Sequence, residues 1–305
     1  MITNTDEATI ILAGATGKLG GKIARSLLVR GAKVRAIVRP ESDSDSVAAM
    51  QQQGMSIAEV DYNNHKELTK ACAGGTCVVS ALSGLREVMV EVQTQLLNAA
   101  VEAGVPRFIP SDYSIDFTML SPGTNRNLDL RKEFKERLDK SPIRATSVLC
   151  GMFTNLLKGQ APLVLFPLRR VIYWGDADQP LDFTTMDDTA AYTAAAALDP
   201  DSPRFLRIAG DVVTARGLKE AASEATGNNF RLFRVGGMAT LDTMINMMRR
   251  VYPENGEVFP PWQGMQYMRN MFRGWSKLKP LDNDRYPFMQ WKSVREVLAE
   301  PRVAR

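Results

Sequence analysis

One short segment constrains the fold of this 305-residue chain more than any other: a β-rich run, Thr9 to Ala13, leads directly into the glycine-spaced sequence GATGKLG. Its glycines are Gly14, Gly17 and Gly20, and an apolar pattern of helical period begins immediately after them. In such a strand–loop–helix unit the first glycine permits a tight turn, the second lets the backbone approach a pyrophosphate, and the third lets helix and strand pack closely. The segment therefore predicts a phosphate-binding loop at the start of a dinucleotide-binding domain.

β-rich runs continue to alternate with helical periods through the first half of the chain. The expected strands are Thr9–Ala13, Lys33–Val38, Met55–Val60, Thr76–Leu82, Arg107–Pro110 and Arg144–Leu149. Because an amphipathic stretch separates each strand from the next, every crossover can lay one apolar face on a parallel sheet. We expect an α/β protein with a Rossmann-type, doubly wound parallel sheet.

The rhythm breaks after Gly151, where two further strand-like runs precede an alanine-rich helix. Beyond Phe230, prolines punctuate methionine- and aromatic-rich pieces such as WQGMQYMRNMF. We expect residues 1–152 to form the dinucleotide-binding domain, with residues 171–212 packing back on it. A smaller C-terminal α+β lobe for substrate would then comprise residues 153–170 and 213–305.

Composition excludes several classes of protein. The formal net charge is only +4 and the basic residues are interleaved with acidic ones, so no basic stripe suggests nucleic-acid binding. The single histidine, His65, argues against a multi-histidine metal site and a Ser-His-Asp triad, and no metal is expected.

Three cysteines without a Cys-x-x-Cys pair, and a start that does not look like a signal peptide, favour the cytoplasm. No membrane segment is expected, because the most apolar run, residues 190–198, is shorter than the roughly 20 residues that a span requires.

The end of the second strand indicates which dinucleotide is preferred. An NAD-preferring site generally has an acidic residue there to hold the ribose 2′-hydroxyl, whereas this chain has Arg39. A guanidinium can clamp a 2′-phosphate with two charge-assisted hydrogen bonds, and Lys18 in the loop offers a second cation. NADPH is therefore the expected cofactor, and Glu41 keeps NADH as the weaker alternative.

Ligands of open α/β sheets lie beyond the carboxyl ends of the strands, which places the remaining cofactor contacts. Asp61 and Tyr62 end the third strand and are expected to flank the adenine, and the end of the fourth strand is expected beneath the nicotinamide. The full expected cofactor set is Gly14, Thr16, Gly17, Lys18, Leu19, Gly20, Arg39, Asp61, Tyr62, Ala81, Leu82, Ser83 and Lys132.

Four segments together carry a family resemblance: GATGKLG, AIVRPES, LLNAAVEAGVPRFIPSDYS and IRATSVLCGMFTNLL. In this order they resemble the NmrA-like branch of the atypical short-chain dehydrogenases, and the similarity continues more loosely through YWGDADQPLDFTTMDDTAAYTAAA. The resemblance implies one of two activities. Isoflavone, pinoresinol/lariciresinol and phenylcoumaran benzylic ether reductases reduce aromatic substrates with NADPH, whereas regulator members bind the dinucleotide without chemistry.

The resemblance also implies a catalytic lysine. The Tyr-x-x-x-Lys pair of ordinary short-chain dehydrogenases is absent, because Leu128 stands four positions before Lys132. Lys132 is the best match to the lysine of the reductases, with Arg131 as a competitor if the alignment is shifted by one residue. A lysine near the nicotinamide ribose could orient the cofactor and polarise a substrate oxygen. The alternative is that Lys132 is one more charge on a solvated helix.

A similar Pro-Ser-acidic-aromatic run lines the pocket of the reductases, which implies a pocket role for Ser111, Asp112 and Tyr113 after the fifth strand. Tyr113 is then a candidate acid, or else an aromatic ring that packs a turn onto the core. The expected apolar walls are Met152, Phe153 and Leu156, which suit a small hydrophobic or aromatic substrate.

Two functions remain open from the sequence. The first is an NADPH-dependent reductase of a small hydrophobic or aromatic carbonyl, enone or benzylic ether. The second is a non-catalytic NADP(H)-binding redox sensor that acts through a protein partner, and the missing tyrosine favours it. The sequence leaves open whether the chain forms a homodimer.

Overall fold

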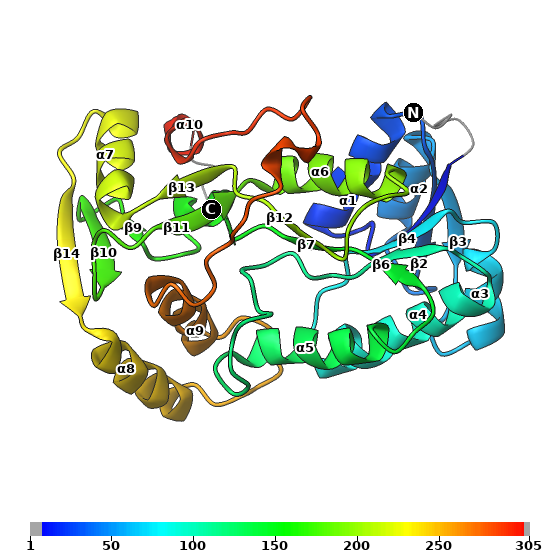
Figure 1. Ribbon diagram of the computed structural model, residues 1–305, viewed down its shortest axis with the longest axis horizontal. Coiled ribbons are helices and arrows are strands. Elements are labelled where there is room, and N and C mark those ends of the chain that lie inside the picture. Colours follow the sequence, from blue (N-terminus) through cyan, green and yellow to red (C-terminus); the bar gives the residue numbers. More distant parts are fainter. Residues whose placement is uncertain (1–7, 302–305) are drawn as a thin grey trace. The chain divides into compact units, whose positions relative to one another are not determined.

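The computed structural model describes residues 8–301, which form two compact units, each assembled from three segments (Figure 1). The first unit comprises the chain up to Asp112 together with Leu130–Val148 and Thr189–Leu206. The second comprises Tyr113–Asp129, Leu149–Asp188 and the chain from Arg207 onward.

A six-stranded parallel sheet organises the first unit, in the order β3-β2-β1-β4-β5-β6. Its strands are β1 (Thr9–Ala13), β2 (Lys33–Val38), β3 (Ser56–Glu59), β4 (Cys77–Ser80), β5 (Arg107–Ile109) and β6 (Arg144–Ala145). The strand order reverses between β1 and β4, which is the switch point beside which ligands of such sheets bind. The predicted Rossmann-type sheet is confirmed.

The last predicted strand, Arg144–Leu149, is two strands in the structure. β6 pairs with β5, whereas β7 (Ser147–Leu149) pairs with β12 (Phe205–Arg207). Thr146, between them, still donates its amide to the carbonyl of Phe108 at 3.0 Å. A continuous β-rich run does not reveal that its two ends pair with different neighbours.

Helices connect the strands, and their apolar faces pack on the sheet. They are α1 (Lys18–Val29), α2 (Ser44–Gln52), α3 (His65–Cys72), α4 (Gln93–Glu102), which continues a π-helical turn at Glu87–Val92, α5 (Arg126–Leu138) and α6 (Met186–Leu198). Asp43 and Asn64 cap the N-termini of α2 and α3, because the side chain of each accepts a hydrogen bond from a backbone amide of the first turn.

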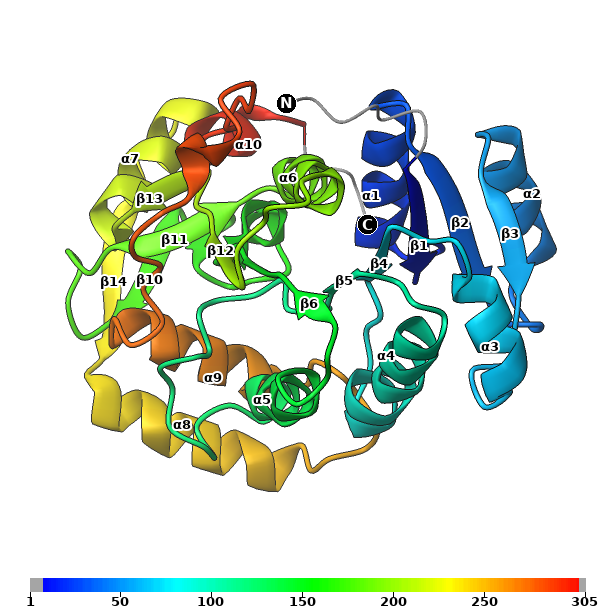
Figure 2. The ribbon, with the colours of Figure 1, turned by 45° about the vertical axis from the view of Figure 1, so that its right-hand side comes forward.

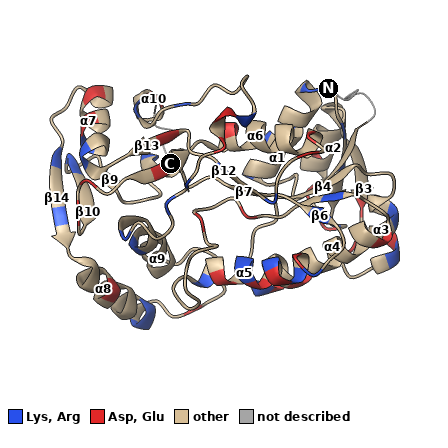
Figure 3. Ribbon diagram, in the orientation of Figure 1, with Lys and Arg blue, Asp and Glu red and all other residues tan. Residues whose placement is uncertain are grey.

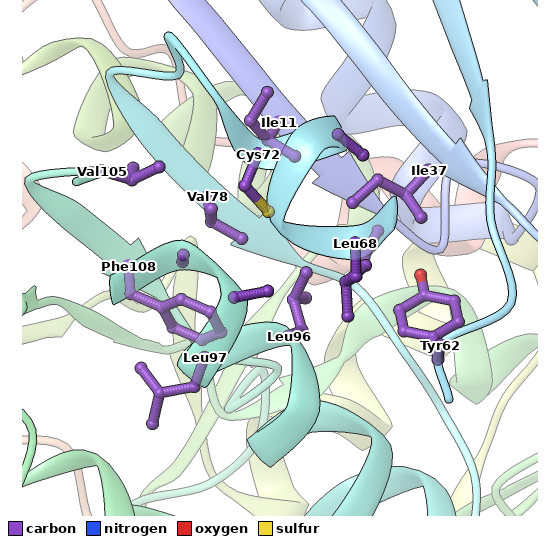
Figure 4. Close-up of a cluster of buried hydrophobic side chains, with 14 of the residues drawn as sticks. Ile11, Ile37, Tyr62, Leu68, Cys72, Val78, Leu96, Leu97, Val105 and Phe108 are labelled. Atoms are coloured by element: carbon purple, nitrogen blue, oxygen red, sulfur yellow. The ribbon is translucent and has the colours of Figure 1, made fainter. Parts of the chain in front are cut away.

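The core beside α3 and α4, which lie side by side, is shown in Figures 2 and 4. Leu68 and Cys72 of α3 meet Leu96 and Leu97 of α4 there, together with strand residues such as Val78. Burial raises the pKa of the Cys72 thiol to about 12, so this cysteine is an inert core residue at neutral pH.

The second unit contains two small three-stranded sheets. One has the order β14 (Arg231–Gly236), β10 (Arg170–Trp174), β9 (Val164–Leu165), and the other β13 (Asp211–Val213), β11 (Leu181–Thr184), β8 (Met152–Phe153). Both mix parallel and antiparallel pairs. The helices of this unit are α7 (Ala215–Thr226), α8 (Met238–Val251), α9 (Pro261–Phe272) and α10 (Val294–Ala299), with short 3₁₀ turns at Thr154–Lys158 and Asn283–Arg285. The expected smaller α+β part in the C-terminal region is confirmed.

Residues 8–301 lack two features. Within this range no helix combines the length and the apolar character needed to cross a membrane. The same residues contain no group of three or more His, Cys, Asp or Glu side chains that could hold a metal ion.

Candidate active site

Two glycines of the loop after β1 are required by the packing of the first unit. Gly14 has a φ of +83°, and a Cβ placed there would lie 2.6 Å from the carbonyl oxygen of Ala81, just after β4. A Cβ on Gly20 would overlap the carbonyl oxygen of Gly14. Gly17 differs, because its φ is −79° and an added Cβ would meet only the carbonyl oxygen of Gly14, at 3.3 Å. The fold needs the outer two glycines, whereas the middle one leaves an open approach to the backbone.

The N-terminus of α1 faces this open approach. Its N-cap is Gly17, whose lack of a side chain leaves the amides of the first turn without a side-chain cap. Thr16, Gly17 and Lys18 are exposed, and Leu19 is half-buried. Uncapped amides and the positive end of a helix dipole are the groups that bind a phosphate. The loop therefore fits a pyrophosphate.

Arg39 follows β2 directly and is 68% exposed. Its Nε lies 3.4 Å from Oε1 of Glu41, which is equally exposed. An ion pair of this kind contributes about 0–1 kcal/mol, so Glu41 holds the guanidinium only weakly. A ligand phosphate that accepts two hydrogen bonds from Arg39 would replace this contact.

Asp61 and Tyr62, which follow β3, differ in the exposure of their side chains to solvent. Asp61 is exposed and accepts hydrogen bonds from the amide of Asn63 at 2.9 Å and from its side chain at 3.2 Å. Tyr62 is 6% exposed and belongs to the core cluster of Figure 4, where burial raises the pKa of its hydroxyl. Asp61 is therefore the residue of this pair whose side chain reaches solvent.

A buried amide fixes the backbone between the ends of β4 and β5. Gln93, 1% exposed at the start of α4, accepts a hydrogen bond from the amide of Ser111 at 2.9 Å and donates one to the carbonyl of Met89 at 3.0 Å. The Ser111 hydroxyl donates to the carbonyl of Leu82 at 2.7 Å. The expected nicotinamide-side segment, Ala81 to Ser83, is thus tied to Ser111. Sequence reasoning missed Gln93, and its only signal was a polar residue within the apolar stripe of this helix.

Asp112 is a buried carboxylate of the first unit. It is 1% exposed, and its Oδ2 accepts a hydrogen bond from the Ser147 hydroxyl at 2.7 Å, which in turn accepts one from Nη1 of Arg204 at 2.7 Å. Burial raises the pKa of Asp112, although the Ser147 hydrogen bond and the charges of Arg131, Arg204 and Lys135 act in the opposite direction. Ser147 and Arg204 were also missed, because they come from distant parts of the sequence.

The two cations considered for catalysis lie on α5. Arg131 and Lys132 are both half-buried, three and four residues after the fully buried Leu128, so both lie beside it on the helix. Figure 3 shows that α5 carries charges of both signs. Many of them are paired, as in the contacts of Arg137 with Glu91 at 2.8 Å. The position of Leu128 alone does not distinguish Lys132 from Arg131.

The other expected pocket residues belong to the second unit. Tyr113 and Met152 are buried, and Phe153 and Leu156 are half-buried. Met152 and Phe153 form β8, which pairs with β11. This unit has a cavity of about 10 Å³, room for one water-sized group, lined by Ile115, Pro180, Leu181, Asp182, Met271, Ser276 and Lys277.

The sequence profile of the NmrA-like family matches residues 6–277. The chain belongs to this family. Pinoresinol reductase 1 of Arabidopsis thaliana is 30% identical to this NmrA-like chain over 210 residues, which span 64% of the chain and 66% of that protein. The isoflavone reductase homolog of Lupinus albus is 24% identical over 256 residues, 78% of this chain and 82% of the relative. The family resemblance expected from the sequence is confirmed.

Solved structures share the fold of this NmrA-like protein. AtPrR2 with NADP+ and (+)-pinoresinol has a TM-score of 0.82 at 23% identity, covering 96% of this chain and 98% of that one. The binary complex of leucoanthocyanidin reductase with NADPH from Vitis vinifera has a TM-score of 0.77 at 18% identity, covering 95% and 98%. Structural neighbours of the chain thus bind NADP+ or NADPH.

Proposed function

We propose that this NmrA-like protein is an NADPH-dependent reductase of a small hydrophobic or aromatic substrate that carries a carbonyl, an enone or a benzylic ether. The main observation in support is the loop after β1, where two glycines are required by packing and the third leaves uncapped helix amides open to a phosphate. The exposed Arg39 at the end of β2 supplies a cation in place of the acidic residue of NAD sites.

The residues have distinct roles in this proposal. Gly14, Gly20 and the backbone of Thr16 to Leu19 hold the pyrophosphate, while Arg39 and Lys18 bind the 2′-phosphate. Asp61 and the backbone at Tyr62 border the adenine, and Ala81, Leu82 and Ser83 border the nicotinamide side. NADPH supplies the hydride when it is bound, and the protein contributes binding and orientation.

Lys132 orients the nicotinamide ribose and polarises the substrate oxygen in this proposal, with Tyr113 as the candidate acid. The substrate contacts are assigned to Ser111, Asp112, Tyr113, Met152, Phe153 and Leu156. The buried hydrogen bonds of Ser111 to Gln93 and Leu82 support a fixed backbone at the start of this set.

Steady-state NADPH oxidation tests the proposal, with a panel of aromatic ketones, enones and benzylic ethers. Lys132→Ala should lower kcat by about 100-fold or more while NADPH affinity changes little, because a positioned acid–base group contributes in this range. Arg131→Ala is the matched control and should do little. If Arg131→Ala is the damaging change instead, the catalytic cation is Arg131.

The alternative is the non-catalytic sensor, which one observation favours: the apolar, fully buried Leu128 stands where ordinary short-chain dehydrogenases have tyrosine. Wild-type protein that binds NADPH tightly but oxidises it with no member of the panel would overturn the reductase proposal in favour of this sensor.

A further inference from the structure

Strand β14 is an open edge of the second unit. It forms one end of the three-stranded sheet β14-β10-β9, and no described residue extends the sheet beyond it (Figure 1). The amide of Arg231 donates to the carbonyl of Arg169 at 3.0 Å, so the main-chain groups of Arg231 point towards β10. Because main-chain groups alternate in direction along a strand, the N–H and C=O groups of Leu232 and Arg234 point away from β10. They can form hydrogen bonds with a further strand.

One face of this sheet reaches solvent beside the open edge. Arg170 is level with Arg231 in the register of the two strands, and the next pair on the same face is Ile172 with Phe233. Arg231 is exposed and Phe233 is 54% exposed, whereas the two β10 residues are half-buried. Val171, on the opposite face, is fully buried. The exposed face therefore combines an aromatic ring with arginines.

The positive charge of this sheet is uncompensated. Its three strands contain Arg170, Arg231 and Arg234 and no acidic residue, and Arg169 directly precedes β10 (Figure 3). None of the four arginines forms an ion pair within residues 8–301. Arg170 donates to the carbonyl of Arg169 at 3.3 Å, and Arg234 donates to that of Gly175 at 3.2 Å. A partner that carries carboxylates would supply the missing negative charge.

The aromatic ring indicates that the edge binds a partner. Charged side chains on an edge strand commonly protect it from association, but an exposed ring between them, here Phe233, favours association. A second copy of β14 would add arginines instead of carboxylates, and like charges on neighbouring strands destabilise a sheet. A lipid surface has no row of N–H and C=O groups to pair with those of Leu232 and Arg234. An extended acidic peptide meets all of these requirements.

We propose that β14 binds an extended acidic segment of a partner protein as an additional strand. The main chain of the segment pairs with Leu232 and Arg234. One carboxylate contacts Arg231, and an apolar side chain two positions away, on the same face, packs on Phe233. A further carboxylate contacts Arg234 on the other face. The recognised pattern, read along β14, is acidic, any residue, apolar, acidic.

This inference goes beyond the proposed function and does not depend on it. None of the β14 residues is among those assigned to the cofactor or the substrate. Binding of the acidic segment can therefore be measured whether or not the protein oxidises NADPH.

Fluorescence anisotropy with the labelled, end-blocked peptide ETFEFTE tests the proposal. The sequence is palindromic, so it presents the recognised pattern in either strand direction. Wild type should bind it with a Kd below about 1 mM. The peptide KTFKFTK, with lysine in place of glutamate, should not bind. An analogue of ETFEFTE with N-methylated main-chain amides keeps every side chain but cannot donate from its main chain, and it should bind at least about tenfold more weakly.

Two variants of β14 and one matched control locate the site. Arg231→Glu should weaken binding of ETFEFTE by about tenfold or more, the loss expected for a hydrogen bond to a charged group. Phe233→Thr keeps a β-branched residue but removes the ring, and should weaken binding by about fivefold or more. Arg250→Glu makes the same change in net charge at an exposed site in the last turn of α8. It should change binding by about twofold or less, because salt screens distant exposed charges. All three variants should keep the circular dichroism spectrum of wild type.

Several outcomes would overturn the proposal. They are no binding of ETFEFTE at about 1 mM, equal binding of its N-methylated analogue, or an Arg250→Glu variant that weakens binding as much as Arg231→Glu does. The last two would show attraction by charge alone. A wild-type dimer in sedimentation that Phe233→Thr dissociates would assign the edge to a second copy of the chain. Phosphatidylserine vesicles that bind wild type but not Phe233→Thr would assign it to a lipid surface.

Discussion

Arg39 and Glu41 are the two exposed side chains on which the proposed preference for NADPH depends. The guanidinium stands where NAD sites have a carboxylate, and the carboxylate that does lie nearby contacts it across 3.4 Å. Because both groups are largely exposed, their mutual attraction is small beside that between an arginine and a phosphate. In the proposed site, Glu41 would therefore moderate the preference for NADPH without reversing it.

Arg39→Ala should weaken NADPH binding by about 1.5–3 kcal/mol, the range for a hydrogen bond to a charged group, and should change NADH binding far less. Glu41→Gln, the matched change on the partner, should tighten NADPH binding by at most about 1 kcal/mol because it frees the guanidinium. Calorimetric titration of both dinucleotides into the three proteins measures these differences. A wild type that prefers NADH would contradict the assignment.

Asp112 makes stability depend on pH in an unusual direction. Burial raises the pKa of its carboxyl in the folded state above the ordinary value of 3.8. Between these two pKa values the unfolded chain binds fewer protons than the folded one, so the free energy of unfolding falls as pH rises through this window. Asp112→Asn should remove this fall in the free energy of unfolding, because asparagine does not ionise. The variant should match or exceed wild type at neutral pH, with the difference shrinking as pH falls towards about 4.

Urea unfolding at a series of pH values measures this effect. Ser147→Ala is an informative second variant, because the Ser147 hydrogen bond favours the charged carboxylate. Without this hydrogen bond the pKa of Asp112 in the folded state should rise further, so the free energy of unfolding should continue to fall up to a higher pH. Parallel curves for wild type and Asp112→Asn over this range would show that Asp112 titrates alike in both states.

At the scale of elements, the loop after β1 contains two glycines that packing requires and a third, Gly17, to which the proposed function assigns a role in binding. Gly14 and Gly20 are in close contact with backbone atoms, so their substitution tests only the fold. Gly17 and Gly21 form a matched pair, since an added Cβ would meet backbone oxygens at 3.3 and 3.4 Å respectively. Only Gly17 is exposed at the start of α1.

Gly17→Ala should therefore leave the circular dichroism spectrum intact but weaken NADPH binding by about tenfold or more, because the methyl group blocks the approach of the pyrophosphate. Gly21→Ala should bind NADPH normally and gain about 0.5–1 kcal/mol of stability within the helix. Chemical denaturation and cofactor titration of both variants measure these effects. Normal binding by Gly17→Ala would mean that the phosphate lies elsewhere.

The elements that sequence predicts well here are those set by local pattern. β1 and β2 have the predicted ends, because their apolar runs are bounded by turn residues. The glycine spacing located the loop after β1, and the end of the second strand located Arg39. The hydrogen bonds of Gln93, Ser147 and Arg204 were not predicted, because they join residues 18 to 57 positions apart in the sequence. Burial of Tyr62 was also missed, because the core cluster that contains it combines strand residues such as Ile37 with helix residues such as Leu96.

At the scale of the whole molecule, the chain alternates between the two units. Each unit is built from three segments, and two of the junctions, after Asp129 and Asp188, fall inside helices α5 and α6. The core of the first unit consequently includes Phe134, Leu138 and Ile143, which follow a segment of the second unit. The first unit is therefore not a contiguous N-terminal piece of the chain.

A fragment that ends at Asp112 should fail to fold cooperatively and should not bind NADPH. It lacks β6 and the buried side chains of Phe134 and Leu138, each of which contributes about 1.5–3 kcal/mol, out of a typical total stability of about 5–15 kcal/mol. In the full chain, Phe134→Ala should lower the free energy of unfolding by about 3–5 kcal/mol. Phe259→Ala, at a site 63% exposed, should change it by about 0.5 kcal/mol or less. Thermal and urea unfolding with and without NADPH measure these differences. If the fragment melts cooperatively and binds NADPH as the full chain does, residues beyond Asp112 are dispensable for the first unit.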